Sequence, residues 1–219
     1  MEKKRNKTAI EKALDLIDVL KDRDAVGVTE LSHILGLNKN NVFRLLATLS
    51  EKGLVEQNEN KDYRLGMGFL FLEKAYIHNL GFFFEAKPFL KKLRNKTGET
   101  VYLSILHNDE VVYIQMEESK KAVLVGSRIA KRYPADTTAS GKVLKSNNTN
   151  EFKLKYDFEE TEPEVSEVAT VIKDKSGKNI ASISIVAPIS RLNPNNVYKF
   201  ETDLLETAKE ISKTLGFNG

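Results

Sequence analysis

Two short glycine-containing segments of this sequence contain residue types that are found in nucleotide-binding loops. The triplet Ser-Gly-Lys at 140–142 matches the end of a phosphate-binding loop, whose backbone N–H groups and lysine hold phosphates. Asp136 replaces the first glycine of that loop, and Val143 stands where serine or threonine would hold magnesium. The triplet Gly-Met-Gly at 66–68 begins a dinucleotide-binding pattern, but Phe71 replaces its third glycine. Neither group therefore predicts nucleotide binding.

An acidic group, Asp157, Glu159 and Glu160, has the residue types needed for general acid and base catalysis. A run of acids is more often a solvated loop. The chain has no Cys, which excludes disulfides, thiolate chemistry and cysteine zinc sites, and its three His residues are far apart in the sequence. We therefore predict that the protein is not an enzyme and that it needs no cofactor or metal.

Composition and charge suit a cytoplasmic protein. The first residues are charged, and no apolar run reaches the roughly 20 residues that a membrane span requires. A chain of 219 residues with 41% hydrophobic residues can form a small domain and a larger one. The net charge of +3 alone gives weak support for nucleic-acid binding. The distribution of the charges is more informative.

Two short helical patterns, at residues 28–36 and 38–54, have the order of a helix-turn-helix motif. In the second pattern Val42, Leu45, Leu46 and Leu49 recur at helical spacing and define a buried face. Asn38 can cap this helix, Gly36 can form the turn before it and Gly53 can end it. The side chains predicted to face DNA are Lys39, Asn40, Asn41, Phe43 and Arg44. A small amphipathic helical hairpin without a DNA role is the alternative.

The segments around this motif complete a winged domain. Thr8 and Glu11 form a capping box, and the helix after it has its apolar residues on one predicted face: Ile10, Ala13, Leu14, Ile17 and Leu20. Two short strands, 54–56 and 63–65, flank a polar tip and predict a hairpin wing that places Lys61 and Arg64 beside phosphates. A basic arm of Lys3, Lys4, Arg5 and Lys7 either contacts DNA or is a solvated terminus.

An apolar segment separates this domain from the rest of the chain. It contains Leu70, Leu72, Ala75, Tyr76, Leu80 and three Phe residues at 82–84. Such a surface must be covered, either by a partner subunit or by the second domain of the same chain. A helix over 84–96 then presents Phe89, Leu90 and Leu93 on one face.

The remaining sequence mixes strand and helix patterns. Runs at 100–106, 110–117 and 122–127 predict meandering antiparallel strands, and 168–173 and 180–188 predict two more around a turn. Helices are predicted at 138–145 and 194–215. These patterns indicate an α+β fold.

The residues from Thr8 to about Gly68, with the core NVFRLLATLSEKGLVEQ and the segment YRLGMG, resemble the IclR family of bacterial transcriptional regulators. The resemblance continues through the segment that begins KPFLKKL, through TTASGK at 137–142 and through IASISIVAPISRL at 180–192. It implies a winged helix-turn-helix domain at 1–68, a linker helix at 69–85 and a GAF/profilin-like antiparallel sheet domain at 86–219. It also implies a homodimer, or a dimer of dimers, that binds double-stranded operator DNA as a repressor or activator.

The resemblance further implies a small-molecule effector in the C-terminal domain. Carried over residue by residue, the effector-binding positions are Thr138, Ala139, Ser140, Asp157, Glu167 and Ser184. Glu167 replaces a neutral residue of the family pattern, Val186 replaces a small polar one, and the stretch 145–157 is shorter than the pattern. We expect this shortening to leave the pocket shallow, open or nonfunctional.

Like charges at Asp157 and Glu167 disfavour an anionic effector unless a cation or a proton intervenes, so the sequence predicts a neutral or cationic one. Three alternatives to effector binding stay open at this point. The C-terminal domain could serve in assembly only, Thr138 and Ser184 could merely satisfy local backbone groups, or the chain could be a small α+β enzyme.

Overall fold

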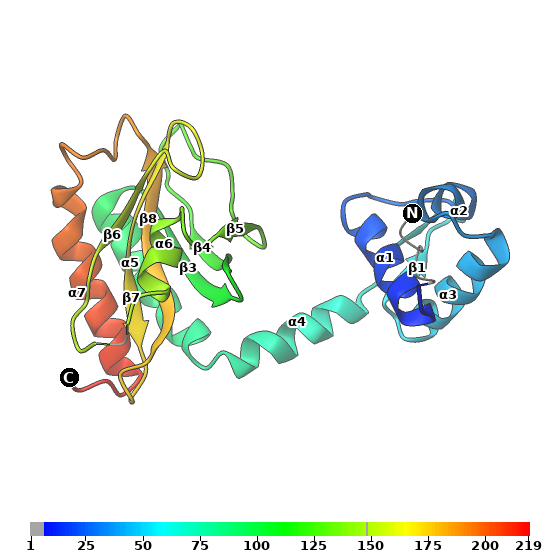
Figure 1. Ribbon diagram of the computed structural model, residues 1–219, viewed down its shortest axis with the longest axis horizontal. Helices are drawn as coiled ribbons and strands as arrows, with labels where there is room; N and C mark the ends of the chain where they lie inside the picture. The colour runs from blue at the N-terminus through cyan, green and yellow to red at the C-terminus, as the bar shows by residue number, and fades with distance from the viewer. Residues whose placement is uncertain (1–6, 148) are drawn as a thin grey trace, which may run out of the picture. The chain divides into compact units, whose positions relative to one another are not determined.

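The computed structural model describes residues 7–147 and 149–219, and the chain divides into two compact units, Met1–Leu80 and Gly81–Gly219 (Figure 1). The division falls inside the predicted linker at 69–85. Of the predicted basic arm, Lys3, Lys4 and Arg5 lie outside the described residues, and Lys7 pairs with Asp15 at 2.7 Å. Within the described residues, every helix is too short or too polar to span a bilayer.

The first unit is the predicted winged helix-turn-helix, and the structure confirms it. Its elements are α1 (Ala9–Lys21), α2 (Val28–Leu35), α3 (Lys39–Glu51), the antiparallel strands β1 (Val55–Gln57) and β2 (Tyr63–Leu65), and α4 (Gly68–Asn79). The capping box of Thr8 and Glu11 begins α1, and the side chain of Asn38 accepts the N–H of Asn41 at the start of α3. Gly36 takes the left-handed conformation that ends α2.

The core of this unit corrects the predicted face of α1. Leu16 and Leu20 are the buried residues of α1, and they pack with α2 and α3 residues that include Leu31. Ile10 and Leu14 are instead 73% and 56% exposed. The predicted stripe was placed on a neighbouring row of the helix, because an apolar pattern around most of a helix does not say which row is covered.

The second unit is an antiparallel sheet with helices, as the predicted α+β class requires. Its elements are α5 (Phe82–Thr97), β3 (Thr100–His107), β4 (Glu110–Glu117), β5 (Arg132–Pro134), α6 (Ala139–Leu144), β6 (Lys155–Phe158), β7 (Val165–Lys173), β8 (Asn179–Pro188) and α7 (Tyr198–Thr214). The strand order is β5-β4-β3-β8-β7-β6, with antiparallel pairing throughout.

Helices cover this sheet on both sides. The long helices α5 and α7 pack on each other and on β3 and β7, and α6 packs against β6, β7 and β8 (Figure 1). Ala139 and Val143 of α6 form a small core with Ala169 of β7. Cross-strand register places Ala169 beside Ser184, and Ser184 beside Tyr102. All three therefore lie on the face of the sheet that α6 covers.

Three predictions about this unit are wrong. Residues 122–127 form no strand, and their apolar side chains Val123 and Leu124 are exposed, so the β-prone composition reflects surface residues. The short edge strands β5 and β6 were missed because three or four residues give too short a pattern. The last helix begins at Tyr198 and not at 194, because turns precede it in which the Asn193 side chain accepts the N–H of Asn195.

A buried carboxylate holds the irregular segment 118–131 against the sheet. Glu99, immediately before β3, is 1% exposed and accepts two hydrogen bonds from the Arg191 guanidinium at 2.8 and 2.9 Å. Lys121 also pairs with Glu99, and Arg191 donates to the carbonyl of Val123 at 3.0 Å. These contacts fix one end of the segment, and an isolated bridge between Ile129 and Tyr113 fixes the other.

Helix α6 approaches the backbone of Ala135 closely at Gly141. A Cβ at Gly141 would lie 2.2 Å from the carbonyl oxygen of Ala135. We expect Gly141→Ala to lower the free energy of unfolding by about 1–3 kcal/mol, the usual cost of overpacking. Urea unfolding measures this loss. The control is Gly126→Ala, where a Cβ would meet no heavy atom within 4 Å, and equal loss in both variants would contradict the close-packing argument.

Candidate functional sites

Helix α3 presents a polar face to solvent. Lys39, Asn40 and Arg44 are exposed, Phe43 is half exposed beside them, and Asn41, whose N–H donates to the Asn38 cap, is partly buried. Val42, Leu46 and Leu49 on the other side are buried in the core, while Leu45 is partly buried. The helix therefore has one anchored face and one face whose donors are free to contact a groove.

The wing adds two cations beside this helix. Lys61 lies at the tip with a φ of 65°, and Arg64 on β2 pairs with Glu56 on β1 at 2.8 Å. Both members of that pair are substantially exposed, so the pair contributes little stability. Arg64 can therefore exchange Glu56 for a phosphate at low cost. Lys61 makes no side-chain ion pair within the described part of the chain.

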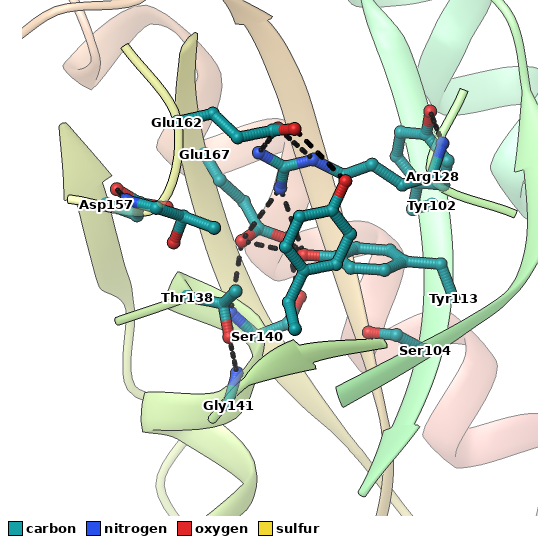
Figure 2. A network of polar contacts seen from close by, with 12 residues as sticks. Tyr102, Ser104, Tyr113, Arg128, Thr138, Ser140, Gly141, Asp157, Glu162 and Glu167 are labelled. Carbon is teal, nitrogen blue, oxygen red and sulfur yellow. Dashed lines mark hydrogen bonds and ion pairs between the residues drawn. The ribbon is translucent and has the colours of Figure 1, made fainter. Parts of the chain in front are cut away.

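The six predicted effector residues lie in the second unit, and Figure 2 shows four of them, Thr138, Ser140, Asp157 and Glu167, close together. All six side chains are buried. Thr138, Ala139 and Ser140 begin α6, Asp157 on β6 is the register partner of Glu167 on β7, and Ser184 lies on β8. The structure brings these positions to the face of the sheet that α6 covers. It does not by itself test whether they bind a ligand.

For two of the six residues, Thr138 and Ser184, the alternative was that they only form hydrogen bonds with nearby backbone groups. Thr138 has that role, because its hydroxyl accepts the N–H of Gly141 at 3.1 Å and donates to the carbonyl of Pro134 at 3.3 Å. Ser184 differs. Its buried hydroxyl has no hydrogen-bond partner among the residues that the structure describes.

Glu167 is the centre of a polar network. Its carboxylate accepts the hydroxyl of Ser140 at 2.6 Å and the hydroxyl of Tyr113 at 3.0 and 3.1 Å. The guanidinium of Arg128 lies 3.7 Å away, and both charged side chains are fully buried. Burying a carboxylate without a cation would be very unfavourable, so Arg128 is what makes Glu167 tolerable at this position.

Arg128 was not predicted from the sequence as a site residue, although it has the most interaction partners in this site. Its Nε and Nη2 donate to Glu162 at 3.0 and 2.7 Å, and its Nη1 donates to the hydroxyl of Tyr113 at 3.0 Å. Its guanidinium carbon lies 5.0 Å from the centre of the Tyr133 ring. Burial would lower the pKa of the Arg128 guanidinium, but the charge of Glu167 and the Glu162 hydrogen bonds outweigh burial and raise it.

This arrangement corrects the charge argument made from the sequence. That argument treated Asp157 and Glu167 as acids without a cation, and Arg128 supplies one. The only sequence signal was indirect: an acid inside the apolar run of β7 requires a positive partner. Nothing in the sequence selects Arg128 over the other lysines and arginines as that partner.

Asp157 is the second buried acid of the site. Its Oδ1 accepts the N–H groups of Glu160 and Thr161 at 2.8 and 3.3 Å, whereas its Oδ2 has no partner within residues 7–147 and 149–219. Burial raises the pKa of the Asp157 carboxyl, and the hydrogen bonds from Thr161 and Glu160 reduce that rise. Asp157 is therefore easier to protonate than an exposed Asp.

We expected the shortened stretch at 145–157 to open the six residues to solvent. In the structure it does not. A hollow of about 800 Å³ lies instead between residues 150–153 and α7, where Phe152, Leu205 and Phe217 line it. The six predicted effector residues are all buried, and Arg128 and Glu162 lie in the same polar network (Figure 2).

Comparisons with known proteins cover both units. Residues 9–59 match the model of the IclR helix-turn-helix domain, and residues 74–156 and 147–213 match that of the C-terminal domain of the bacterial transcriptional regulator IclR. The chain is 29% identical over 245 residues to the HTH-type transcriptional regulator XynR of Escherichia coli (strain K12), with 95% of this chain and 97% of XynR covered.

Two solved structures show the same fold. The IclR protein of Thermotoga maritima has a TM-score of 0.79 at 24% identity, with 95% of this chain and 98% of that one covered. An IclR homologue of Microbacterium hydrocarbonoxydans complexed with 4-hydroxybenzoate has a TM-score of 0.78 at 19% identity, with 95% and 99% covered. The fold prediction and the family resemblance are thereby confirmed.

The raised pKa of Asp157 predicts how stability depends on pH. Its carboxyl holds a proton more tightly in the folded chain than in the unfolded chain. That stabilisation is complete below the ordinary pKa of Asp, about 3.9, and is lost as the pH rises through the raised value. We expect the unfolding free energy of the wild type to fall relative to Asp157→Asn as the pH rises from about 3.

Urea unfolding across that pH range measures the difference. Asp174→Asn is the matched control, because the hydrogen bond from Ser176 lowers the pKa of the partly exposed Asp174 carboxyl. Its stabilisation is present above the ordinary pKa and is lost on acidification, so the trend has the opposite sign. The same trend in both variants would show that burial at Asp157 is not the cause.

Proposed function

Because this chain belongs to the IclR family of bacterial transcriptional regulators, we propose that it binds double-stranded operator DNA through α3 and the wing. A small-molecule effector bound beside α6 controls this binding, and the protein has no enzymatic role. Regulation of transcription places it with the DNA in the cytoplasm. The observation that carries the proposal is the pairing of an anchored helix face with an exposed polar one on α3.

The residues for DNA recognition have distinct roles. Asn40 and Arg44 are suited to base edges in the major groove, since an amide reads adenine and a guanidinium reads guanine. Lys39, Asn41 and Phe43 lie at the start or flank of the same helix. Lys61 and Arg64 on the wing contact phosphates, where positive charge contributes by counterion release.

The proposed assembly is a homodimer, alone or as a dimer of dimers. Helix α4 carries four large apolar side chains, Leu70, Phe71, Leu72 and Tyr76, each between 54% and 69% exposed. A continuous apolar surface of this kind on a soluble regulator needs a cover. A second copy of α4 is the simplest cover for a protein that reads a two-fold site.

Substitutions on α3 and on the wing should have different effects on DNA binding. Arg44→Ala should cost about 1–3 kcal/mol at the cognate operator and leave nonspecific binding nearly unchanged. Lys61→Ala should weaken binding to all sequences and reduce the salt slope by about one unit, because it removes one phosphate contact. Titrations of a duplex selected in vitro, at several salt concentrations, distinguish these results.

The control for both variants is Lys92→Ala, since Lys92 is an exposed lysine of the second unit that pairs with Glu210 at 3.0 Å. It should change neither affinity nor salt slope. An Arg44→Ala variant with full affinity would exclude α3 as the reading helix.

The dimer predicts a concentration-dependent effect of a charge on α4. Leu72→Glu should weaken association about 10- to 100-fold, because burying a leucine contributes about 1.5–3 kcal/mol. Lys74→Glu places the same charge on an exposed polar position of the same helix and should have little effect. Sedimentation at micromolar concentration measures both variants. A wild-type protein that sediments as a monomer there would contradict the proposed assembly.

A further inference from the structure

We propose that Glu162 is a built-in competitor of the effector: its carboxylate occupies Arg128, and the carboxylate of an anionic effector binds by exchanging with it. This inference rests on the proposed effector function of the site and names the chemical class of the ligand. It assigns Arg128 as the residue that reads the ligand's charge. It assigns Glu162 as the residue that sets how strongly a ligand must compete.

The two acids around Arg128 are held very differently. Glu167 is fully buried on β7 and also accepts hydrogen bonds from Ser140 and Tyr113. The side chain of Glu162 is 35% exposed and lies between β6 and β7, outside regular structure. Both of its shortest contacts to Arg128 use a single oxygen, Oε2, and Tyr133 donates to the other at 3.1 Å. Glu162 is therefore the partner that can leave.

The segment that carries Glu162, residues 159–164, is attached mainly through polar contacts. Lys142 pairs with Glu160 at 2.6 Å, and the hydroxyls of Thr161 and Thr137 lie 3.2 Å apart. Water can replace such contacts at low cost. Glu159 and Glu164 both have a φ of 64°, which is unfavourable for residues with a side chain. Movement of this segment therefore costs less than movement of the sheet.

Charge balance selects the class of ligand. Arg128 is fully buried, so removal of Glu162 without replacement would leave its guanidinium with one carboxylate, that of Glu167 at 3.7 Å, and with the hydroxyl of Tyr113. A monocarboxylate that takes the place of Glu162 keeps the buried charge unchanged and restores the short hydrogen bonds. A neutral ligand cannot do so, and a cation would add a charge beside Arg128.

Two unpaired oxygens extend this description of the ligand. Among the described residues, Asp157 Oδ2 and Ser184 Oγ are buried without a hydrogen-bond partner, and both lie on the face that α6 covers. Asp157 Oδ2 accepts when ionised, and Ser184 can donate or accept. A hydroxyl group on the ligand would satisfy such atoms. The inferred ligand is a small hydroxy monocarboxylate whose acid group replaces the propionate-like side chain of Glu162.

The test is binding of lactate to the full chain in the absence of DNA, measured by calorimetry and thermal shift. Glu162→Ala removes the competitor, so lactate should bind about ten-fold or more tightly to this variant than to the wild type, as loss of one competing interaction predicts. Lactate should also raise the melting temperature of Glu162→Ala more than that of the wild type. Lactamide, which has the same shape without the charge, should do neither.

Glu110→Ala is the matched control, because Glu110 pairs with Arg132 at 3.4 Å on an exposed part of the same sheet. It should bind lactate as the wild type does. If Glu162→Ala does not fold, Glu162→Gln keeps the side-chain size, removes the charge and should shift affinity in the same direction. Equal lactate affinity in the wild type and the Glu162 variant, no lactate binding to that variant, or equal binding of lactamide would overturn the exchange. Wild type that fails to bind duplex DNA would instead contradict the proposed function, since the lactate experiment uses no DNA.

Discussion

A buried guanidinium must keep a carboxylate beside it, and the second unit is arranged around this requirement at Arg128. Burying either charge without its partner would cost several kcal/mol. This cost is larger than the stabilisation that one favourable interaction contributes. Two acids from the β6–β7 region and the hydroxyl of Tyr113 on β4 therefore meet at one guanidinium. The strand register and the segment 118–131 are linked by this single electrostatic condition.

The described part of the DNA-binding unit contains no fully buried charge, and much of this unit could be predicted from the sequence. Its helices are short periodic patterns with local caps, so Asn38, Gly36 and the capping box fix their ends within a few residues. The error at Ile10 and Leu14 concerned which row of α1 is covered, and that depends on contacts between helices that no local pattern encodes.

The sheet unit was less accessible to sequence reasoning, because its features depend on residues far apart in the chain. The long strands β7 and β8 could be predicted from their apolar runs, whereas β5 and β6 exist through pairing with neighbours. The six predicted effector positions came from the family resemblance. The resemblance did not identify Arg128, because the role of this residue depends on Glu162 and Glu167, which approach it only in the folded chain.

The clamp of Arg191 and Lys121 on the buried Glu99 has a consequence for how this protein can diverge. The segment that carries Arg128 is fixed near its start by this clamp, and near its end Ala130 donates to the carbonyl of Tyr113 at 3.0 Å. Between these attachments, residues 124–127 lie outside any strand, so they can be exchanged, lengthened or shortened without altering the register of the sheet. New ligand preferences can therefore arise by mutation of one surface segment while the scaffold is inherited unchanged.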